Sequence, residues 1–188
     1  LVHQKLKPRL EYGTTFVYEK IELPLVPVLA RMERTGIRLD TERLGEVAVD
    51  IGKRVEEAEA RCHQLAGRPF RVSSTQEVSQ MLFEELGLPV VKKTKTGFST
   101  DSSVLEALSD KHELPLAILE WRSLSKLVST YLKKLPTYVA SDGRIHTTLN
   151  QAVAATGRLS STDPNLQNIP VRTFEGRRIR QAFVPDPG

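Results

Sequence analysis

Apolar residues recur at spacings of three and four in two long stretches of the chain. The first follows Asp40, a residue type that caps helices, and ends at Gly67; its apolar positions are Leu44, Val47, Ile51, Val55, Ala58, Cys62 and Leu65. The second ends at Pro136 and has apolar residues at Leu124, Leu127, Val128, Tyr131 and Leu135. A long helix with one narrow apolar face needs a partner helix. The pattern therefore predicts an antiparallel helical hairpin over residues 41–66 and 116–135.

A smaller helical tip is predicted between the two long helices, at about residues 70–110. Ser74 and Glu77 have the spacing of a capping box, and Gly87 ends the helix that follows them. Residues 92–99 form a basic loop, and a short helix around residues 104–108 leads back to the hairpin.

The segments on either side of the hairpin have different patterns. Before it, one apolar helical face that ends at Gly36 predicts an amphipathic helix leaving a preceding domain: Ile21, Leu25, Val28, Leu29 and Met32. After it, a turn signal at Ser141–Gly143 precedes an alternating strand pattern at Arg144–Thr147. The predicted fold is mainly α, with a short β and loop segment after a boundary near Leu135.

Composition narrows the class of protein. The chain has 188 residues, of which 39% are hydrophobic and 27% charged, as is ordinary for a soluble globular protein. Its one cysteine, Cys62, cannot form an internal disulfide, and no apolar run approaches the roughly 20 residues of a membrane helix. We expect a cytoplasmic protein without membrane contact. The net charge of +4 is concentrated at Lys92, Lys93 and Lys95, which have no acid nearby in sequence, and at five arginines within residues 151–184, which favours an anionic partner.

The polar segment from Gln151 to Arg172 carries the clearest chemical signal. It combines two arginines with hydroxyls and with the amides Asn165, Gln167 and Asn168, and it is too polar for a core. Amides offer both donors and acceptors, and arginine offers a planar fork of donors. Such side chains suit phosphates, sugars or base edges, and nucleic acid presents all three.

Several motifs in the chain share one resemblance. The segment ATGRLSSTDPNLQNIPVR at residues 155–172 resembles the start of the palm in bacterial family A DNA polymerases, the DNA polymerase I group. Further motifs resemble the exit from that family's exonuclease domain (residues 18–40), its thumb tip (83–101), its returning thumb helix (119–131) and its first palm strand (143–151). The resemblance implies three regions, which are the tail of an exonuclease-like domain or linker (1–22), a thumb (23–136) and the N-terminal part of a palm that becomes α+β (137–188).

The resemblance also implies a set of DNA contacts in the thumb. The tip loop would rest on the minor groove of the primer-template duplex through Lys92, Lys93, Thr94 and Lys95. Arg122, Lys126 and Thr130 recur along one helix face opposite the apolar seam, and the first two match the family's RxxxK pair. Lys133, which continues this series, is interpreted as a solvated residue, and a solvated face is the alternative for the whole stripe.

In the palm segment, Arg158 matches the family arginine that reaches into the minor groove near the primer terminus. Asn165, Gln167 and Asn168 match residues that contact the template and primer backbone, although such amides could instead satisfy a turn. Arg172 matches an arginine near the template strand and the incoming nucleotide. Ala154 departs from the family, where threonine is common at this position.

Catalytic groups are not expected in this chain. The family holds two Mg²⁺ ions with carboxylates from a DYSQIELR-like strand and an HDE-like turn, and neither motif is present. Magnesium and dNTPs are therefore expected only for the complete polymerase. The 188-residue chain is expected to be an inactive piece of that longer polymerase and to bind no cofactor itself. The expected partners are primer-template duplex DNA and the remaining polymerase chain, meaning the fingers and the rest of the palm, within a monomer that acts in replication or repair.

Two other interpretations stay open. The chain could be a non-catalytic nucleic-acid-binding module that reuses a polymerase thumb, or a structural helical hairpin whose basic residues serve only solubility. His146 and Trp121 are interpreted as structural residues, because no nucleophile accompanies the histidine and the tryptophan lies near the apolar seam.

Overall fold

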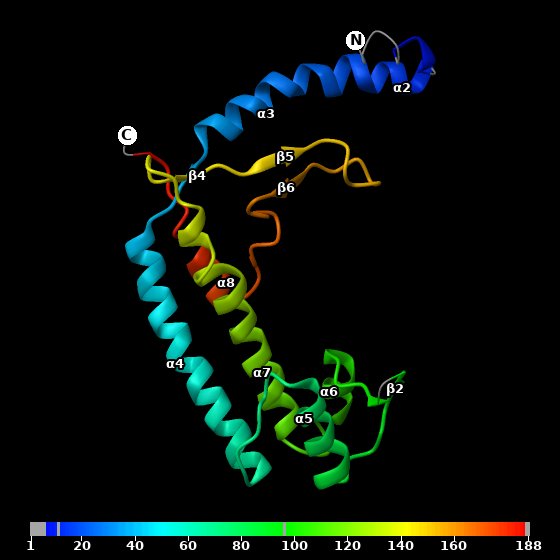
Figure 1. Cartoon of the computed structure of the whole chain (residues 1–188), viewed down its shortest axis with the longest axis vertical. Helices are drawn as coiled ribbons and strands as arrows, with labels where there is room; N and C mark the ends of the chain where they lie inside the picture. The colour runs from blue at the N-terminus through cyan, green and yellow to red at the C-terminus, as the bar shows by residue number, and fades with distance from the viewer. Residues whose placement is uncertain (1–6, 11, 96, 187–188) are drawn as a thin grey trace.

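Helices dominate the structure, a computed structural model that describes residues 7–10, 12–95 and 97–186. Residues 1–6 and 11 of the predicted linker and residues 187–188 of the predicted palm segment lie outside this description. Within it, the strands form three short two-stranded antiparallel ribbons. Figure 1 shows two long helices, a helical tip at their lower end, and strands and a separate helical rod at their upper end. The predicted mainly α fold is confirmed.

The rod at the N-terminal side consists of η1 (Lys7–Arg9), α2 (Tyr12–Val17), the π-helical η2 (Tyr18–Glu22) and α3 (Leu23–Thr35). Of its predicted apolar face, Leu29 is buried, whereas Ile21, Val28 and Met32 are about half exposed. Gly36 ends the rod: its φ of +65° lies in the left-handed region, and its N–H donates to the Met32 carbonyl at 2.8 Å.

The predicted hairpin forms from α4 (Thr41–Ala66) and α7 (Leu114–Leu127), and α7 continues into the π-helical η4 (Val128–Leu132) and the short η5 (Leu135–Tyr138). Asp40 caps α4 by accepting a hydrogen bond from the Arg43 backbone N–H at 2.9 Å, and Gly67 ends it with a φ of +72°. The apolar seams bury each other in a hairpin core made of Leu39, Leu44, Val47, Ile51, Ala58, Leu124, Leu127, Tyr131, Leu132, Leu135, Ile145, Ile179 and Ala182.

The tip consists of α5 (Thr75–Ser79), η3 (Gln80–Glu85), the ribbon of β2 (Lys93–Thr94) and β3 (Gly97–Phe98), and α6 (Ser102–Leu108). It has its own tip core, which α4 and α7 complete with Cys62 and Leu114. Burial raises the pKa of Cys62 to about 11. The predicted capping box forms only in part, because Ser74 accepts from the Glu77 N–H at 3.3 Å but the Glu77 carboxylate accepts from the Arg71 N–H at 2.7 Å instead.

Short elements close the upper end of the hairpin. They are β1 (Ile37–Arg38) paired with β4 (Arg144–Ile145), β5 (Thr148–Asn150) paired with β6 (Ser160–Thr162), and α8 (Phe174–Arg180). The sequence reasoning missed α8, which Thr173 caps by accepting from the Gly176 N–H at 3.0 Å. Ile179 of α8 belongs to the hairpin core, so this core extends across the boundary predicted near Leu135.

Candidate nucleic-acid interface

A groove between the hairpin and the loop after β6 brings together four of the residues predicted from sequence. They are Lys126 and Thr130 on one side and Asn165 and Asn168 on the other. The groove has a volume of about 720 Å³ and is open to solvent. Its remaining lining residues are Tyr131, Lys134, Leu135, Tyr138, Ser161, Thr162, Asp163 and Pro164. Positive charge and side-chain amides therefore face the same space.

The helical wall of the groove carries its charge in a row. Lys126 and Thr130 are exposed, and Lys134 extends the row by a further four residues. Sequence reasoning missed Lys134 and placed Lys133 at the end of the series, because it assumed regular α-helical spacing. Residues 128–132 form a π-helical turn, which contains more residues per turn and so moves the later positions around the axis. The regular spacing of four from Lys126 through Thr130 to Lys134 was the sequence signal that could have identified Lys134.

The loop wall is held by hydrogen bonds between side chains and backbone. The buried Ser161 accepts from the Leu166 N–H at 3.0 Å, and the Thr147 hydroxyl lies 2.8 Å from the Pro164 carbonyl oxygen. Asn165 Oδ1 accepts from the Gln167 N–H at 3.0 Å, which is the turn bond considered as its alternative role. That bond uses one acceptor of the amide, and the amide also carries two N–H donors. The loop is thus fixed while Asn165 stays exposed.

Gln167 and Asn168 are also exposed but are held differently. The Gln167 side chain donates to the Leu159 carbonyl at 2.6 Å and lines a neighbouring apolar groove next to Met32 and Ile37. The Asn168 backbone carbonyl accepts a hydrogen bond from the Tyr131 hydroxyl, which crosses from the hairpin. Only Asn168 of these two lines the candidate groove.

The two arginines of the polar segment lie outside the groove lining. Arg158 is exposed in the connection between β5 and β6, directly after Gly157, whose φ is +73°. Arg172 is exposed before α8, and its backbone carbonyl accepts from Arg177 Nη1 at 3.0 Å. Their predicted DNA contacts stay predictions.

The basic tip loop is a ribbon with one internal ion pair. Lys92 Nζ lies 2.8 Å from Asp101 Oδ2, so the sequence-based view that the three lysines have no acid nearby is wrong for Lys92 in three dimensions. This bond, with those from Ser103 and the Val104 N–H, holds the pKa of Asp101 well below its usual range. Lys93 and Lys95 are exposed, and the Thr94 hydroxyl donates to the Gly97 carbonyl at 3.0 Å.

Arg122 departs from the outward stripe expected on the returning helix. Its guanidinium points to the tip, where it donates to the Thr100 backbone carbonyl and, at 3.2 Å, to the Thr100 hydroxyl. It is partly buried, and burial lowers its pKa. Because the sequence gives no sign of the Thr100 contact, the stripe was extended too far toward the tip. Arg122 joins the ribbon to the hairpin in this structure, and a DNA contact by it stays a prediction.

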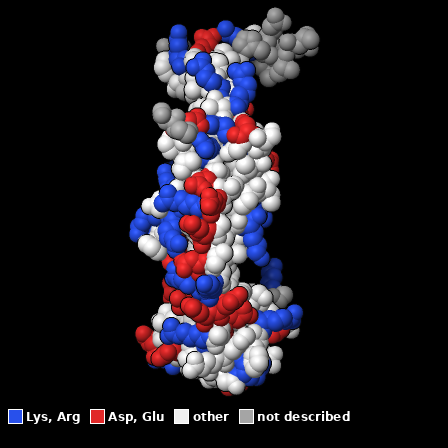
Figure 2. Space-filling model, turned by 90° about the vertical axis from the view of Figure 1, so that its left-hand side faces the viewer, with Lys and Arg blue, Asp and Glu red and all other residues white. Residues whose placement is uncertain are grey.

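The outer face of α4 has a different charge pattern from the groove. Figure 2 shows acidic and basic side chains interleaved over this face. Arg54 Nη1 lies 2.5 Å from Glu175 Oε1, Arg61 Nη2 lies 3.5 Å from Glu113 Oε2, and Arg178 pairs with Asp50. Paired charges of this kind neutralise one another, so this face is less suited to an anion than the groove is.

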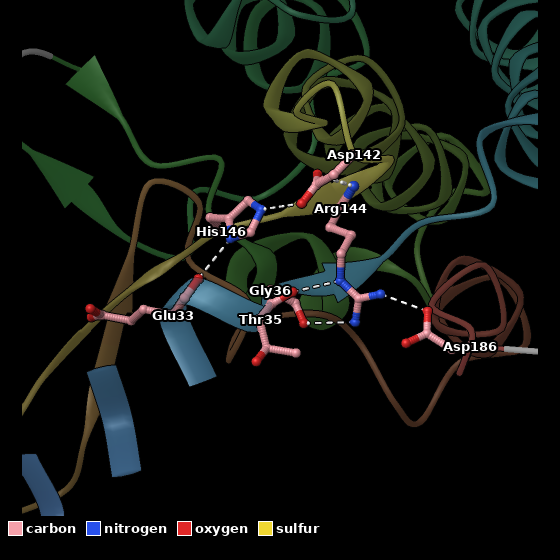
Figure 3. Close-up of polar contacts among 7 residues, drawn as sticks. All are labelled: Glu33, Thr35, Gly36, Asp142, Arg144, His146 and Asp186. Atoms are coloured by element: carbon pink, nitrogen blue, oxygen red, sulfur yellow. Dashed lines mark hydrogen bonds and ion pairs between the residues drawn. The ribbon is translucent and has the colours of Figure 1, made fainter. Parts of the chain in front are cut away.

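His146 and Arg144 form a polar joint between α3 and β4 (Figure 3). His146 Nδ1 donates to the Glu33 carbonyl at 2.7 Å, and Nε2 lies 3.0 Å from Asp142 Oδ2. Arg144 donates to the Thr35 carbonyl at 2.5 Å and pairs with Asp186 at 2.6 Å. The structural interpretation of His146 agrees with these contacts.

No group of three or more His, Cys, Asp or Glu residues among the described residues is placed to hold a metal ion. Within the same residues, no helix is both long and apolar enough to cross a bilayer.

The hairpin, its tip and the elements at its base together have the fold of one part of a nucleic-acid polymerase domain. They match a solved structure described as the POL domain of Pol1 from M. smegmatis in complex with DNA primer-template and dNTP, with a TM-score of 0.86, 41% identity, and coverage of 97% of this chain and 32% of that one. The chain belongs to DNA polymerase family A, whose family model matches residues 41–188. The resemblance found in the sequence is confirmed.

Similar proteins agree with this membership. DNA polymerase I of Bacillus subtilis (strain 168) is 48% identical over 186 residues, which cover 98% of this chain and 21% of that protein. The thermostable DNA polymerase I of Thermus thermophilus is 50% identical over 190 residues, covering 98% of this chain and 23% of that protein. The chain thus spans about a fifth of the length of these relatives.

Proposed function

We propose that this chain is the thumb and the beginning of the palm of a DNA polymerase I-like DNA-directed DNA polymerase. In this proposal, residues 1–22 are the tail of an exonuclease-like domain or a linker, residues 23–136 the thumb and residues 137–188 the N-terminal part of the palm. The chain clamps primer-template duplex and positions the primer terminus. The supporting observation is the groove in which Lys126 and Thr130 face Asn165 and Asn168.

The chemistry of the groove suits the sugar-phosphate backbone. Ammonium groups of Lys126 and Lys134 can neutralise phosphates without reading sequence, and amides can bond phosphate, sugar or base edges. The exposed Lys93 and Lys95 of the tip and Arg158 and Arg172 of the palm segment would extend the same contact. A sequence-independent grip is what a polymerase needs, because it must move along any template.

The activity of the whole protein is part of the proposal. We infer template-directed nucleotidyl transfer that uses dNTPs and two Mg²⁺ ions, in replication or repair, by a monomer in the cytoplasm of a bacterium. The membership in family A and the bacterial DNA polymerase I relatives support this inference. The residues described here would bind and orient the duplex, and the remaining polymerase chain would hold the metal ions.

Binding of a labelled primer-template duplex across a salt series tests the proposed function. The purified chain is expected to bind with a salt dependence, and Lys126→Ala is expected to reduce the slope of log affinity against log salt by about 0.9, the value for one phosphate contact. Lys133→Ala is the matched control, because Lys133 is exposed on the same helical segment but outside the groove lining.

Equal slopes for Lys126→Ala and the unaltered chain would contradict the groove as the contact surface. If the folded chain, checked by circular dichroism, does not bind duplex at low salt, then the proposed function is wrong for this chain.

A further inference from the structure

Tyr131 connects the two walls of the groove. It belongs to η4 on the hairpin, and its hydroxyl donates to the backbone carbonyl of Asn168 on the loop wall. The two residues are 37 positions apart in the chain and lie on opposite sides of the boundary predicted near Leu135. The bond therefore joins the proposed thumb to the proposed palm.

The tyrosine ring is held in place by the hairpin core. Tyr131 is only 5% exposed and is packed in the same core as Leu127, Leu132 and Leu135, while it also lines the groove. A buried ring with a hydroxyl at the edge of a polar groove has little freedom to turn away. A tyrosine hydroxyl, whose ordinary pKa is about 10, is a donor at neutral pH, and burial raises the pKa of Tyr131 further.

The other polar bonds that hold the loop wall come from its own side of the groove. Thr147 binds the Pro164 carbonyl, Ser161 binds the Leu166 N–H, and Gln167 binds the Leu159 carbonyl. These bonds shape the loop but do not fix its distance from the helical wall. Leu166 and Ile169 pack against the hairpin core, and such apolar contact is not directional. Among the hydrogen bonds described for residues 161–168, the bond from the Tyr131 hydroxyl is the one whose donor lies on the hairpin.

We propose that Tyr131 is a positioning residue for DNA binding: its hydroxyl holds Asn168, and with it Asn165, at a fixed separation from Lys126 and Thr130. The inference rests on the proposed function, because it concerns how the same groove grips the duplex. With the loop fixed, the Lys126 ammonium group and the amides of Asn165 and Asn168 can contact one segment of the DNA backbone together. The entropy cost of ordering the loop then falls on folding and not on DNA binding.

Tyr131→Phe is the informative substitution, since it keeps the ring in the core and removes only the donor to Asn168. We expect duplex affinity at low salt to fall about fivefold, the size of one ordinary hydrogen bond. Thr137→Val is the matched control: the Thr137 hydroxyl also donates to a backbone carbonyl, that of Lys134 at 2.8 Å, but Thr137 lies outside the groove lining. Its affinity is expected to stay within about twofold of the unaltered chain.

A double-mutant cycle separates positioning from general loss of structure. Tyr131→Phe is combined with the amide-free variant Asn165→Ala/Asn168→Ala, which leaves the Asn168 backbone carbonyl in place. If Tyr131 acts by placing the amides, Tyr131→Phe has no further effect on affinity in the amide-free variant. Thermal unfolding of each variant confirms that folded protein is compared.

The outcomes are distinct. An unchanged affinity for Tyr131→Phe in the unaltered background, or an equal loss in both backgrounds, would overturn the inference while leaving the proposed function standing. Failure of the unaltered chain to bind duplex would overturn the proposed function and the inference with it.

Discussion

Gly176 shows at the scale of one residue how closely α8 approaches the loop that forms the groove. A Cβ atom added there would lie 2.6 Å from Pro170 Cβ and 2.6 Å from the Pro170 carbonyl oxygen. Both distances are far below van der Waals contact, and one of the two neighbours is backbone. Pro170 directly follows the segment that contains Asn168, so this contact helps set where the loop ends.

Gly176→Ala is expected to destabilise the chain by roughly 1–3 kcal/mol, because the helix and the Pro170 segment must separate to admit the methyl group. Chemical denaturation followed by circular dichroism measures the change. Gly52→Ala is the control: Gly52 lies inside α4 with no heavy atom within 4 Å of an added Cβ, and alanine favours helix, so stability should rise by about 0.5–1 kcal/mol. A neutral Gly176→Ala would show that the Pro170 contact yields easily.

Between elements, the joint of Figure 3 fixes the rod to the rest of the molecule. His146 and Arg144 of the β4 segment bind carbonyls at the C-terminal end of α3, where backbone acceptors have no helical partner. Positive charge at this end also interacts favourably with the helix dipole. Outside this joint, the Leu149 N–H donates to Glu33 Oε1 at 2.6 Å and the Gln151 side chain donates to the Glu22 carbonyl at 3.1 Å. Leu29 of the rod is also buried, so polar bonds and apolar contact together set the direction of the rod.

Stability should depend on pH through this joint. The bond to the Glu33 carbonyl and the Asp142 carboxylate raise the pKa of His146, whereas desolvation and the charge of Arg144 lower it by less. The bond with His146 lowers the pKa of Asp142. A histidine whose pKa is raised by folding stabilises the fold fully below its ordinary pKa of about 6.5, and this contribution is lost as pH rises through the folded value. For Asp142 the contribution is present above its ordinary pKa and is lost as pH falls through the lowered value.

We therefore expect the urea concentration at the unfolding midpoint to decrease as pH rises above the ordinary histidine pKa of about 6.5, and His146→Gln to reduce this dependence. The measurement is urea denaturation at several pH values for both proteins. His112→Gln serves as a control for histidine titration elsewhere, since His112 is in the turn before α7 and away from the joint. Identical pH profiles for His146→Gln and the unaltered chain would refute this role.

The elements also show what sequence could and could not reveal. The seams around Leu44 and Leu124 repeat over many turns, so the hairpin was predictable from spacing alone. Helix α8 is short, and its burial depends on α4 accepting Ile179, a contact that no local pattern encodes. Lys134 was missed because η4 changes the helical spacing, and the partners of Lys92 and Arg122 depend on how the tip ribbon folds back.

Trp121 links the two cores. This residue packs against both the hairpin core and the tip core, and it is the chain's single tryptophan. The tip that carries Lys93 and Lys95 is therefore joined to the hairpin by apolar contact as well as by covalent connection. Such continuity would let the proposed tip and groove contacts act on the duplex as one surface.

Unfolding should accordingly be one cooperative transition. Denaturation followed by Trp121 fluorescence should coincide with that followed by far-ultraviolet circular dichroism. Leu105→Ala, which truncates a fully buried side chain in the tip core, should lower stability by about 2–5 kcal/mol and shift both signals together. Two separated transitions would mean that the tip unfolds independently of the hairpin.

The buried Cys62 lies at the junction of α4 with the tip, where its reaction with a thiol reagent can report local opening. Its side chain is inaccessible and its pKa is raised to about 11, so a thiol reagent meets almost no thiolate while the junction stays closed. Alkylation must wait until the lower end of the hairpin opens. The rate of alkylation would therefore measure how often that end of the hairpin opens. A slower rate in the presence of duplex would show that DNA binding also stabilises a region far from the groove.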